Sequence, residues 1–231
     1  MMPYFIWKNK DSHGDYGLWI SKLPKITRPK ERYSTIDVPG RAGSLIMLEG
    51  DDIYESYQKD ITIQTTNWNP RIDEMKDWLS GKGDLIICTE NDKVYEARIV
   101  GEVSFERIGN NLLQAKIPFF CEPFKKNRYA ASDSITLTAN GTITNKGNVA
   151  SKPKVSVTGS GSNVSVTIAG QTMTFNSLTG TIVVDCDAHM ITQGTSLWAG
   201  TFTGDFWKIP TGQSAVTTAV SITIEPRWRW K

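Results

Sequence analysis

The second half of the chain carries an alternation of residue types that is typical of β-strands. From about residue 134, threonine or serine alternates with valine, isoleucine or leucine in segments such as "SITLTAN", "PKVSVTG", "NVSVTIAG" and "TIVVDC". Successive side chains of a strand point to opposite faces, so a period of two gives each segment one apolar and one polar face. Turn residues separate the segments at the spacing of a β-sandwich. We therefore expect an all-β second half.

Two local signals refine this expectation. Asn140 followed by Gly141 in "TANGTI" predicts a tight hairpin, since this dipeptide favours the turn that joins two paired strands. At the C-terminus, "PRWRWK" alternates Trp228 and Trp230 with cationic residues. We expect a terminal strand within residues 220–231 that buries both indole rings on one face.

A change in composition predicts two domains. Residues 1–128 contain 19 basic and 19 acidic residues, whereas residues 129–231 contain 7 and 5. Serine plus threonine changes in the opposite direction, from 13 to 29. Such an abrupt shift indicates a domain boundary, which we place near residues 125–133.

The first half is also predicted to be mainly β, with one helix. Short runs rich in β-branched and aromatic residues, such as "DITIQTT" and "VYEARIVG", are separated by Gly, Asn, Asp and Pro. A helix is expected over about residues 70–80, with Asn69 as its cap, Pro70 in its first turn and Gly81 as its stop. It would cover one face of an antiparallel sheet.

Charge and cysteine content exclude several classes of protein. The net charge of +2 lacks the basic excess that holds nucleic acid or an anionic membrane. Cys88, Cys121 and Cys186 are widely spaced, which argues against disulfides or a zinc site, and Cys88 fits a buried core position best. No apolar run is as long as a signal peptide or a membrane span requires. We expect a protein that is made in the cytosol, stays soluble and has neither metal nor cofactor.

The segment "YSTIDVPGRAGSL" contains the most suggestive loop. "VPGRAGS" lacks the lysine and the following helix of a phosphate-binding loop. The alternative is a turn, in which Pro39 fixes φ and Gly40 or Gly43 supplies a positive φ. We favour the turn.

No catalytic constellation is evident. Asp185 and Asp187 would share a strand face and could form the carboxylate pair of a polysaccharide hydrolase, but a strand end with turn-forming aspartates is the favoured interpretation. His13 and His189 each stand alone, so a nucleophile with a histidine base is poorly supported. "DSHGD", around His13, also lacks the pattern of a calcium loop. We expect no enzyme activity.

Trp198 and Trp207 flank "AGTFTGDF" in the second half. An exposed tryptophan on a sandwich can stack on a sugar or fill a pocket of a partner protein. Core positions are the favoured alternative, because large aromatic residues are mostly buried.

Taken in order, several landmarks resemble the distal tail protein family of long non-contractile-tailed bacteriophages that infect Gram-positive bacteria. They are "YSTIDVPGRAGSL", "NPRIDEMKDWLSGKGDLIICTENDKVYEARIV", "IPFFCEPF", "ITNKGNVASKPKVSVTGSGSNVSVTI" and "GTFTGDFWKIPTGQSAV". The resemblance covers nearly the whole chain. It implies a ring-forming N-terminal β domain with one helix, over residues 1–128, and a galectin-like β-sandwich over residues 129–231.

The resemblance also implies a function and partners. The family forms a hexameric ring at the distal end of the tail tube and joins the tube to the tail-tip or baseplate proteins, leaving a channel for DNA. In some phages it also anchors receptor-binding proteins. The implied location is the virion tail, after assembly in the host cytoplasm, and the source is a phage, a prophage or a tail-derived particle.

The resemblance places Pro39, Gly40, Arg41 and Gly43 in a hairpin of the ring domain. Arg41, Tyr54 and Tyr57 are candidates for subunit contact, because arginine and tyrosine are enriched at interfaces, while exposed loop and sheet surface is the alternative. A carbohydrate-binding module that uses Trp198 or Trp207 remains a second hypothesis. The second half lacks the histidine, arginine and asparagine cluster of true galectins, which argues against lectin activity.

Overall fold

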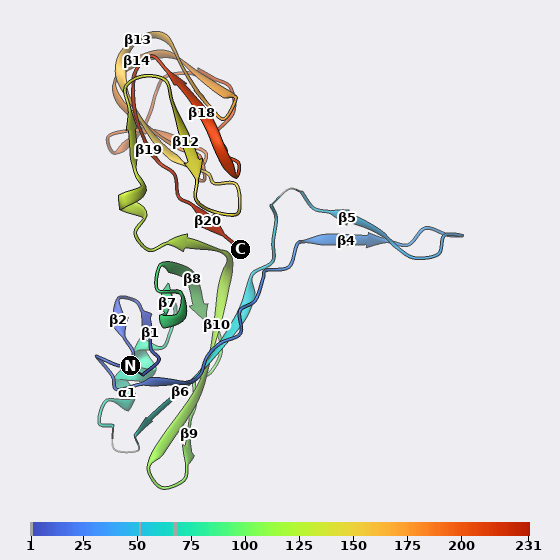
Figure 1. Cartoon of the computed structure of the whole chain (residues 1–231), viewed down its shortest axis with the longest axis vertical. Helices are drawn as coiled ribbons and strands as arrows, with labels where there is room; N and C mark the ends of the chain where they lie inside the picture. The colour runs from blue at the N-terminus through green and yellow to red at the C-terminus, as the bar shows by residue number, and fades with distance from the viewer. Residues whose placement is uncertain (1, 51, 67–68) are drawn as a thin grey trace. The chain divides into compact units, whose positions relative to one another are not determined.

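The computed structural model describes residues 2–50, 52–66 and 69–231. Over these residues the chain is mainly antiparallel β with one α-helix, which confirms the predicted fold class. It divides into two compact units, the first over residues 1–128 with Lys231 and the second over residues 129–230. The division falls within the region where the composition changes. Figure 1 shows the strands of each unit.

The first unit is built on one antiparallel sheet with the order β2-β1-β7-β8-β10-β6-β3, and β9 also pairs with β10. Its strands are β1 (Phe5–Trp7), β2 (Lys10–Asp11), β3 (Trp19–Lys22), β6 (Tyr57–Thr66), β7 (Lys82–Ile87), β8 (Lys93–Ile99), β9 (Phe105–Ile108) and β10 (Leu112–Asn127). A 3₁₀ turn, η1 (Cys88–Glu90), links β7 to β8.

Helix α1 (Ile72–Trp78) is shorter than predicted and begins later. Arg71 occupies the N-cap position and makes no side-chain capping bond. Asn69 instead links two other parts of the chain by hydrogen bonds. Its Nδ2 donates to the carbonyl oxygen of Tyr16 at 2.7 Å and to Oγ1 of Thr65 at 3.0 Å. Its Oδ1 accepts from the backbone N–H of Arg71. The prediction of Asn69 as the cap is therefore wrong, since its side chain makes these hydrogen bonds and Arg71 occupies the N-cap position.

The core of the first unit lies between α1 and the inward face of the sheet. Along β6, alternate residues from Lys59 to Thr65 are buried, as a half-buried strand requires. Cys121 is buried in this core, whereas Cys88 is only half-buried at the start of η1. The sequence suggested Cys88 as the best core cysteine, and the structure gives that position to Cys121 because β7 ends one residue before Cys88.

The second unit is organised by two strands of 15 residues each, β13 (Lys154–Ile168) and β14 (Gln171–Asp185). The other elements are η2 (Ala130–Asp133), β11 (Ile135–Leu137), β12 (Gly141–Asn145), β15 (Met190–Gln193), β16 (Ser196–Leu197), β17 (Phe202–Thr203), β18 (Gly212–Thr218), β19 (Ser221–Glu225) and β20 (Arg229–Trp230).

Each long strand takes part in two layers. Residues 154–158 of β13 pair with β19, while residues 166–168 pair with β18. The change occurs at an irregularity beside Asn163, which has φ 52°. The first layer runs β11-β19-β13-β14-β15-β16, and the second contains β12, β18, β13, β14 and β17. Side chains from both layers share one core, as in a β-sandwich. The separate short strands expected within residues 153–186 are thus two long bent ones.

Two local predictions for this unit are wrong. Asn140 and Gly141 do not form a hairpin, because β11 pairs with β19 and β12 pairs with β18. The residues between β11 and β12 carry the chain from the first layer to the second. There, Asn140 Oδ1 accepts a hydrogen bond from the backbone N–H of Thr218 at 3.0 Å. The terminal strand expected over residues 220–231 is interrupted at Arg227, which has φ 52°. Trp228 is buried, but Trp230 is only half-buried.

Candidate assembly surface

A two-stranded ribbon in the first unit forms a sheet of its own. It consists of β4 (Tyr33–Ile36) and β5 (Leu45–Leu48), which are antiparallel, with Tyr33 opposite Leu48 and Ile36 opposite Leu45. In the described part of the chain, no third strand pairs with either of them. At its base, the backbone N–H of Arg32 donates to the carbonyl of Ile53 at 3.0 Å. The side chain of Arg32 forms an ion pair with Glu49 at 3.0 Å.

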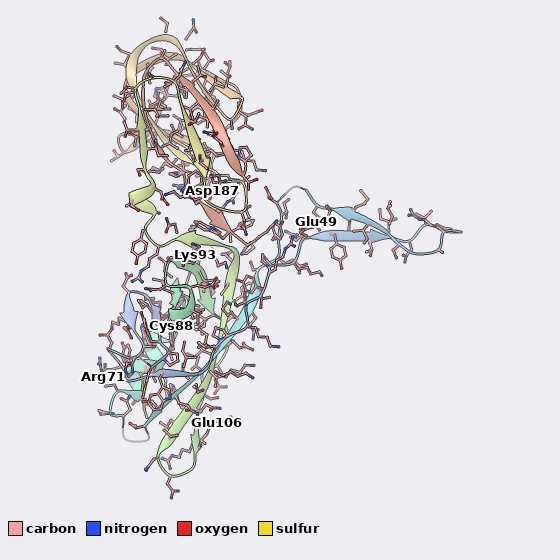
Figure 2. The ribbon with its side chains drawn as sticks, viewed as in Figure 1. Glu49, Arg71, Cys88, Lys93, Glu106 and Asp187 are labelled. Carbon is pink, nitrogen blue, oxygen red and sulfur yellow. The ribbon has the colours of Figure 1, made fainter. Side chains whose placement is uncertain are left out.

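The ribbon exposes apolar side chains on both faces. Residues directly opposite each other share a face, so Tyr33, Ile46 and Leu48 lie on one face and Ile36, Leu45 and Met47 on the other. Ile46 and Leu48 are 64% and 60% exposed. Figure 2 shows side chains on both sides of the ribbon, with Glu49 near one end.

The turn interpretation of "VPGRAGS" is confirmed by the backbone. The segment joins β4 to β5, and Gly40 and Gly43 have φ values of 82° and 83°. A side chain at either position would be strained in this left-handed region. Pro39, Gly40, Arg41 and Gly43 are all exposed. The apolar strands beside them were not identified as a surface in the sequence, although the unbroken run "LIML" lacks the alternation of a half-buried strand.

Tyr54 and Tyr57 occupy different environments from the turn residues. Tyr54 is buried, its ring lies 5.5 Å from that of Phe124 edge-to-face, and its hydroxyl donates to Glu31 at 3.3 Å. Tyr57 is half-buried, and burial raises the pKa of its hydroxyl. The structure therefore brings Pro39, Gly40, Arg41 and Gly43 together at the tip of the ribbon and places both tyrosines at or beyond its base.

A polar cluster lies near Tyr57 on the inward side of the sheet. Lys59 is buried, and its Nζ donates to the carbonyl oxygen of Lys25 at 2.9 Å. Burial lowers the pKa of this ammonium group. Lys125 forms an ion pair with Glu90 at 2.8 Å, and Tyr95 hydrogen-bonds the same carboxylate. These contacts describe a satisfied structural network.

The two candidate tryptophans of the second unit differ in accessibility. Trp207 is buried, and its Nε1 donates to the carbonyl oxygen of Gln171 at 3.0 Å. Its ring therefore lies in the core and is not accessible to a sugar. Trp198 is half-buried, packs edge-to-face on Phe175 at 5.7 Å and lines a surface pocket.

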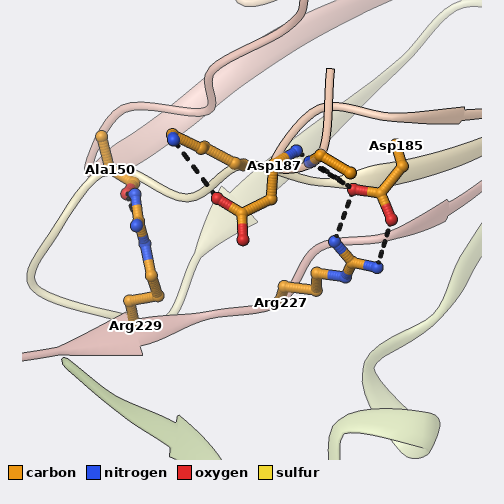
Figure 3. Close-up of polar contacts among 7 residues, drawn as sticks. Ala150, Asp185, Asp187, Arg227 and Arg229 are labelled. Atoms are coloured by element: carbon orange, nitrogen blue, oxygen red, sulfur yellow. Dashed lines mark hydrogen bonds and ion pairs between the residues drawn. The ribbon is translucent and has the colours of Figure 1, made fainter. Parts of the chain in front are cut away.

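The two candidate carboxylates have structural partners. Asp185 accepts two hydrogen bonds from Arg227, each 2.8 Å long, and also accepts the backbone N–H groups of Asp187 and Ala188 (Figure 3). The Arg227 guanidinium lowers the pKa of Asp185 to about 2. Asp187 forms an ion pair with Lys152 at 3.2 Å. A general acid needs a raised pKa, so Asp185 does not have the electrostatics of a glycosidase acid.

The segment around His13 forms a turn. Asp11 Oδ1 accepts the backbone N–H groups of His13 and Gly14, so this carboxylate stabilises a turn. Among residues 2–50, 52–66 and 69–231, no group of three or more His, Cys, Asp or Glu side chains could hold a metal ion. Within the same residues, no helix has the length and apolar character needed to cross a membrane.

Comparison with known proteins adds one structural likeness. No family model and no curated protein matches the chain. Its structure is similar to that of the SPP1 Dit protein (gp 19.1), described as a paradigm of the hub adsorption apparatus in phages that infect Gram-positive bacteria. The TM-score is 0.77 at 12% sequence identity, over 97% of this chain and 98% of that one. At this identity the likeness shows that both units share their fold with a Dit protein.

Proposed function

We propose that this chain is a structural phage tail protein whose N-terminal unit assembles into a ring of six copies at the distal end of the tail tube. The ring joins the tube protein to the tail-tip or baseplate proteins, and in some particles to receptor-binding proteins. The likeness of the whole chain to a phage hub protein supports the tail role. The number of copies and the tube and tip partners follow from the family resemblance.

The observation that carries self-assembly is the apolar ribbon. An isolated two-stranded hairpin is marginally stable in water, and stability normally requires a third strand or a packed face. Among the residues that the structure describes, none covers either face or either outer edge of the ribbon, although Ile46 and Leu48 are large and apolar. Contiguous apolar surface of this kind marks a protein interface. A closed ring covers such a surface identically in every copy.

A variant with two charges on one face of the ribbon tests this proposal. Ile46→Asp with Leu48→Asp places carboxylates on that face without touching a core residue. We expect the variant to remain folded and to lose the assembled species in analytical ultracentrifugation. Ile26→Asp is the matched control, because Ile26 is 90% exposed and lies outside the ribbon. The proposal fails if both variants assemble as the wild type does.

The other two hypotheses have less support from the residues. A hydrolase is disfavoured because Asp185 is held ionised by Arg227. A carbohydrate-binding module would have to use Trp198, since Trp207 is buried. The pocket beside Trp198 offers few polar groups that could bind the hydroxyl groups of a sugar.

A further inference from the structure

Most of the exposed large apolar side chains of the second unit converge on one place. The four exposed ones are Tyr129, Met190, Leu197 and Phe202, with Leu197 the most exposed at 71%. Met190, Leu197 and Phe202 line the same pocket. Single exposed apolar residues need no explanation, but several around one hollow indicate a binding site.

The pocket lies where both layers of the sandwich end. Leu197 belongs to β16, the last strand of the first layer, and Phe202 belongs to β17, which borders β14 in the second layer. Trp198 and Phe206 also line the pocket, whose volume is about 410 Å³. This volume falls within the range of ligand pockets, roughly 300–1,000 Å³. The surface of the sandwich at β16 and β17 thus contains a hollow lined by apolar side chains.

Close packing fixes the walls of the pocket. A Cβ atom at Gly200 would lie 2.1 Å from the indole ring of Trp198, so only glycine lets this ring lie across the backbone. Phe206 is held edge-to-face by Phe202 at 5.7 Å and by His189 at 5.1 Å. The rings are therefore positioned by their neighbours before any ligand arrives, which lowers the entropy cost of binding.

The chemistry of the lining selects an apolar ligand. His189 is the one lining residue with a polar side chain other than the indole of Trp198, whereas a sugar presents many hydroxyl groups that require partners. The size of the pocket selects a short segment. A stable dimer buries about 800 Å² on each partner, but this hollow accommodates only one or two side chains. The occupant is therefore a few residues of another protein rather than a second folded face.

The edge of β16 gives this segment a way to bind through its backbone. The backbone N–H of Trp198 donates to the carbonyl of Ile191 at 3.0 Å, toward β15. Because backbone groups alternate in direction along an antiparallel strand, the N–H and C=O of Leu197 point to the outer side. An extended peptide can add a strand at such an edge and direct alternate side chains into a pocket.

We propose that this pocket is a docking site for an extended apolar segment of a partner protein, which pairs with β16 and inserts a large apolar side chain between Leu197, Phe202 and Trp198. No residue that lines the pocket belongs to the ribbon. The docking proposal therefore does not depend on whether the chain forms a ring.

The test is an NMR titration of the full ¹⁵N-labelled chain. The probe is a blocked heptapeptide in which threonine alternates with leucine around a central phenylalanine. We expect saturable shifts of backbone amide signals within residues 189–206 and of the Trp198 indole signal. Leu197→Asp should weaken binding by about ten-fold or more, as loss of a central apolar contact does. Thr195→Asp is the matched control, since it adds the same charge in the same hairpin outside the pocket, and it should bind as the wild type does.

Phe202→Ala provides a second variant that removes one wall without adding charge, and it should also weaken binding. Three results would overturn the proposal. The first is the absence of saturable shifts around the pocket, and the second is equal affinity of Leu197→Asp and Thr195→Asp for the peptide. The third is a response of the Trp198 signal to methyl β-galactoside but not to the peptide, which would identify a sugar site. None of these results bears on the ring, because ring assembly is measured through the ribbon.

Discussion

Trp7 and Trp78 exchange hydrogen bonds across the core of the first unit. The indole Nε1 of Trp7 donates to the carbonyl oxygen of Trp78 at 3.1 Å, and the indole Nε1 of Trp78 donates to the carbonyl oxygen of Trp7 at 2.9 Å. Trp78 is the last residue of α1, where carbonyl groups lack partners within the helix. The exchange therefore closes the end of the helix and fixes it to β1.

Trp78→Phe should destabilise the first unit by about 1 kcal/mol, because it removes the hydrogen bond that the indole donates to the buried carbonyl of Trp7. Faster amide hydrogen exchange in β1 and β7 would report the loss. Trp19→Phe serves as the control, since Trp19 is a half-buried residue of β3. Equal exchange rates in the two variants would contradict the role of the indole exchange.

Asn69→Asp should also destabilise the first unit. The amide of Asn69 donates to Tyr16 and Thr65, and a carboxylate would face the Tyr16 carbonyl instead. We expect a loss of about 1–3 kcal/mol, the usual cost of an unpaired polar group. The control is Asp73→Asn, whose side chain is 98% exposed. Thermal denaturation compares them, and a loss in Asp73→Asn as large as that in Asn69→Asp would be inconsistent with this assignment.

The Asp185–Arg227 pair should make the stability of the second unit depend on acid pH. The pKa of Asp185 is lowered from 3.8 to about 2 in the folded state. Its contribution is therefore complete above about pH 4 and is lost as the pH falls toward about 2. Asp185→Asn should remove this part of the pH dependence and lower stability near neutral pH by about 1 kcal/mol.

Asp187→Asn is the matched control for that experiment, because the carboxylate of Asp187 pairs with Lys152 at a more exposed site. Melting temperatures measured at several pH values between about 2 and 5 compare the two variants. If Asp185→Asn follows the pH profile of the wild type, the ion pair does not account for the acid sensitivity.

The two tryptophans beside "AGTFTGDF" should respond differently to truncation. Trp207→Ala should destabilise the second unit by about 3–5 kcal/mol, since it leaves a cavity in the core and removes the hydrogen bond to the Gln171 carbonyl. Trp198→Ala should cost less, because its ring lines an open pocket. Urea denaturation measures both, and similar losses would show that Trp198 is as much a core residue as Trp207.

The sequence predicts the fold class because its signals are local. The alternation of threonine with β-branched residues reports strand faces directly, and it correctly indicates an all-β second unit. Long-range pairing is not local. Asn140 and Gly141 have the strongest hairpin signal, yet the partners of β11 and β12 lie between 67 and 89 residues away along the chain, in β19 and β18 respectively.

The candidate surfaces were predictable only in part. The positive φ values at Gly40 and Gly43 follow from the turn signal around Pro39. The exposure of Ile46 and Leu48 does not, because apolar residues in a strand are expected to be buried unless the tertiary context is known. The pocket could not be predicted for the same reason. Leu197 and Phe202 line one pocket only because β16 pairs with β15 in one layer and β17 pairs with β14 in the other.

The most direct test of the proposed ring is the mass of the purified 231-residue chain in solution, measured by light scattering over a range of concentrations. The chain has a mass of 25.7 kDa. The ring predicts a species of about six times this mass, which Ile46→Asp with Leu48→Asp dissociates and Ile26→Asp leaves intact. A single-chain mass at every concentration, unchanged by the ribbon variant, would contradict it.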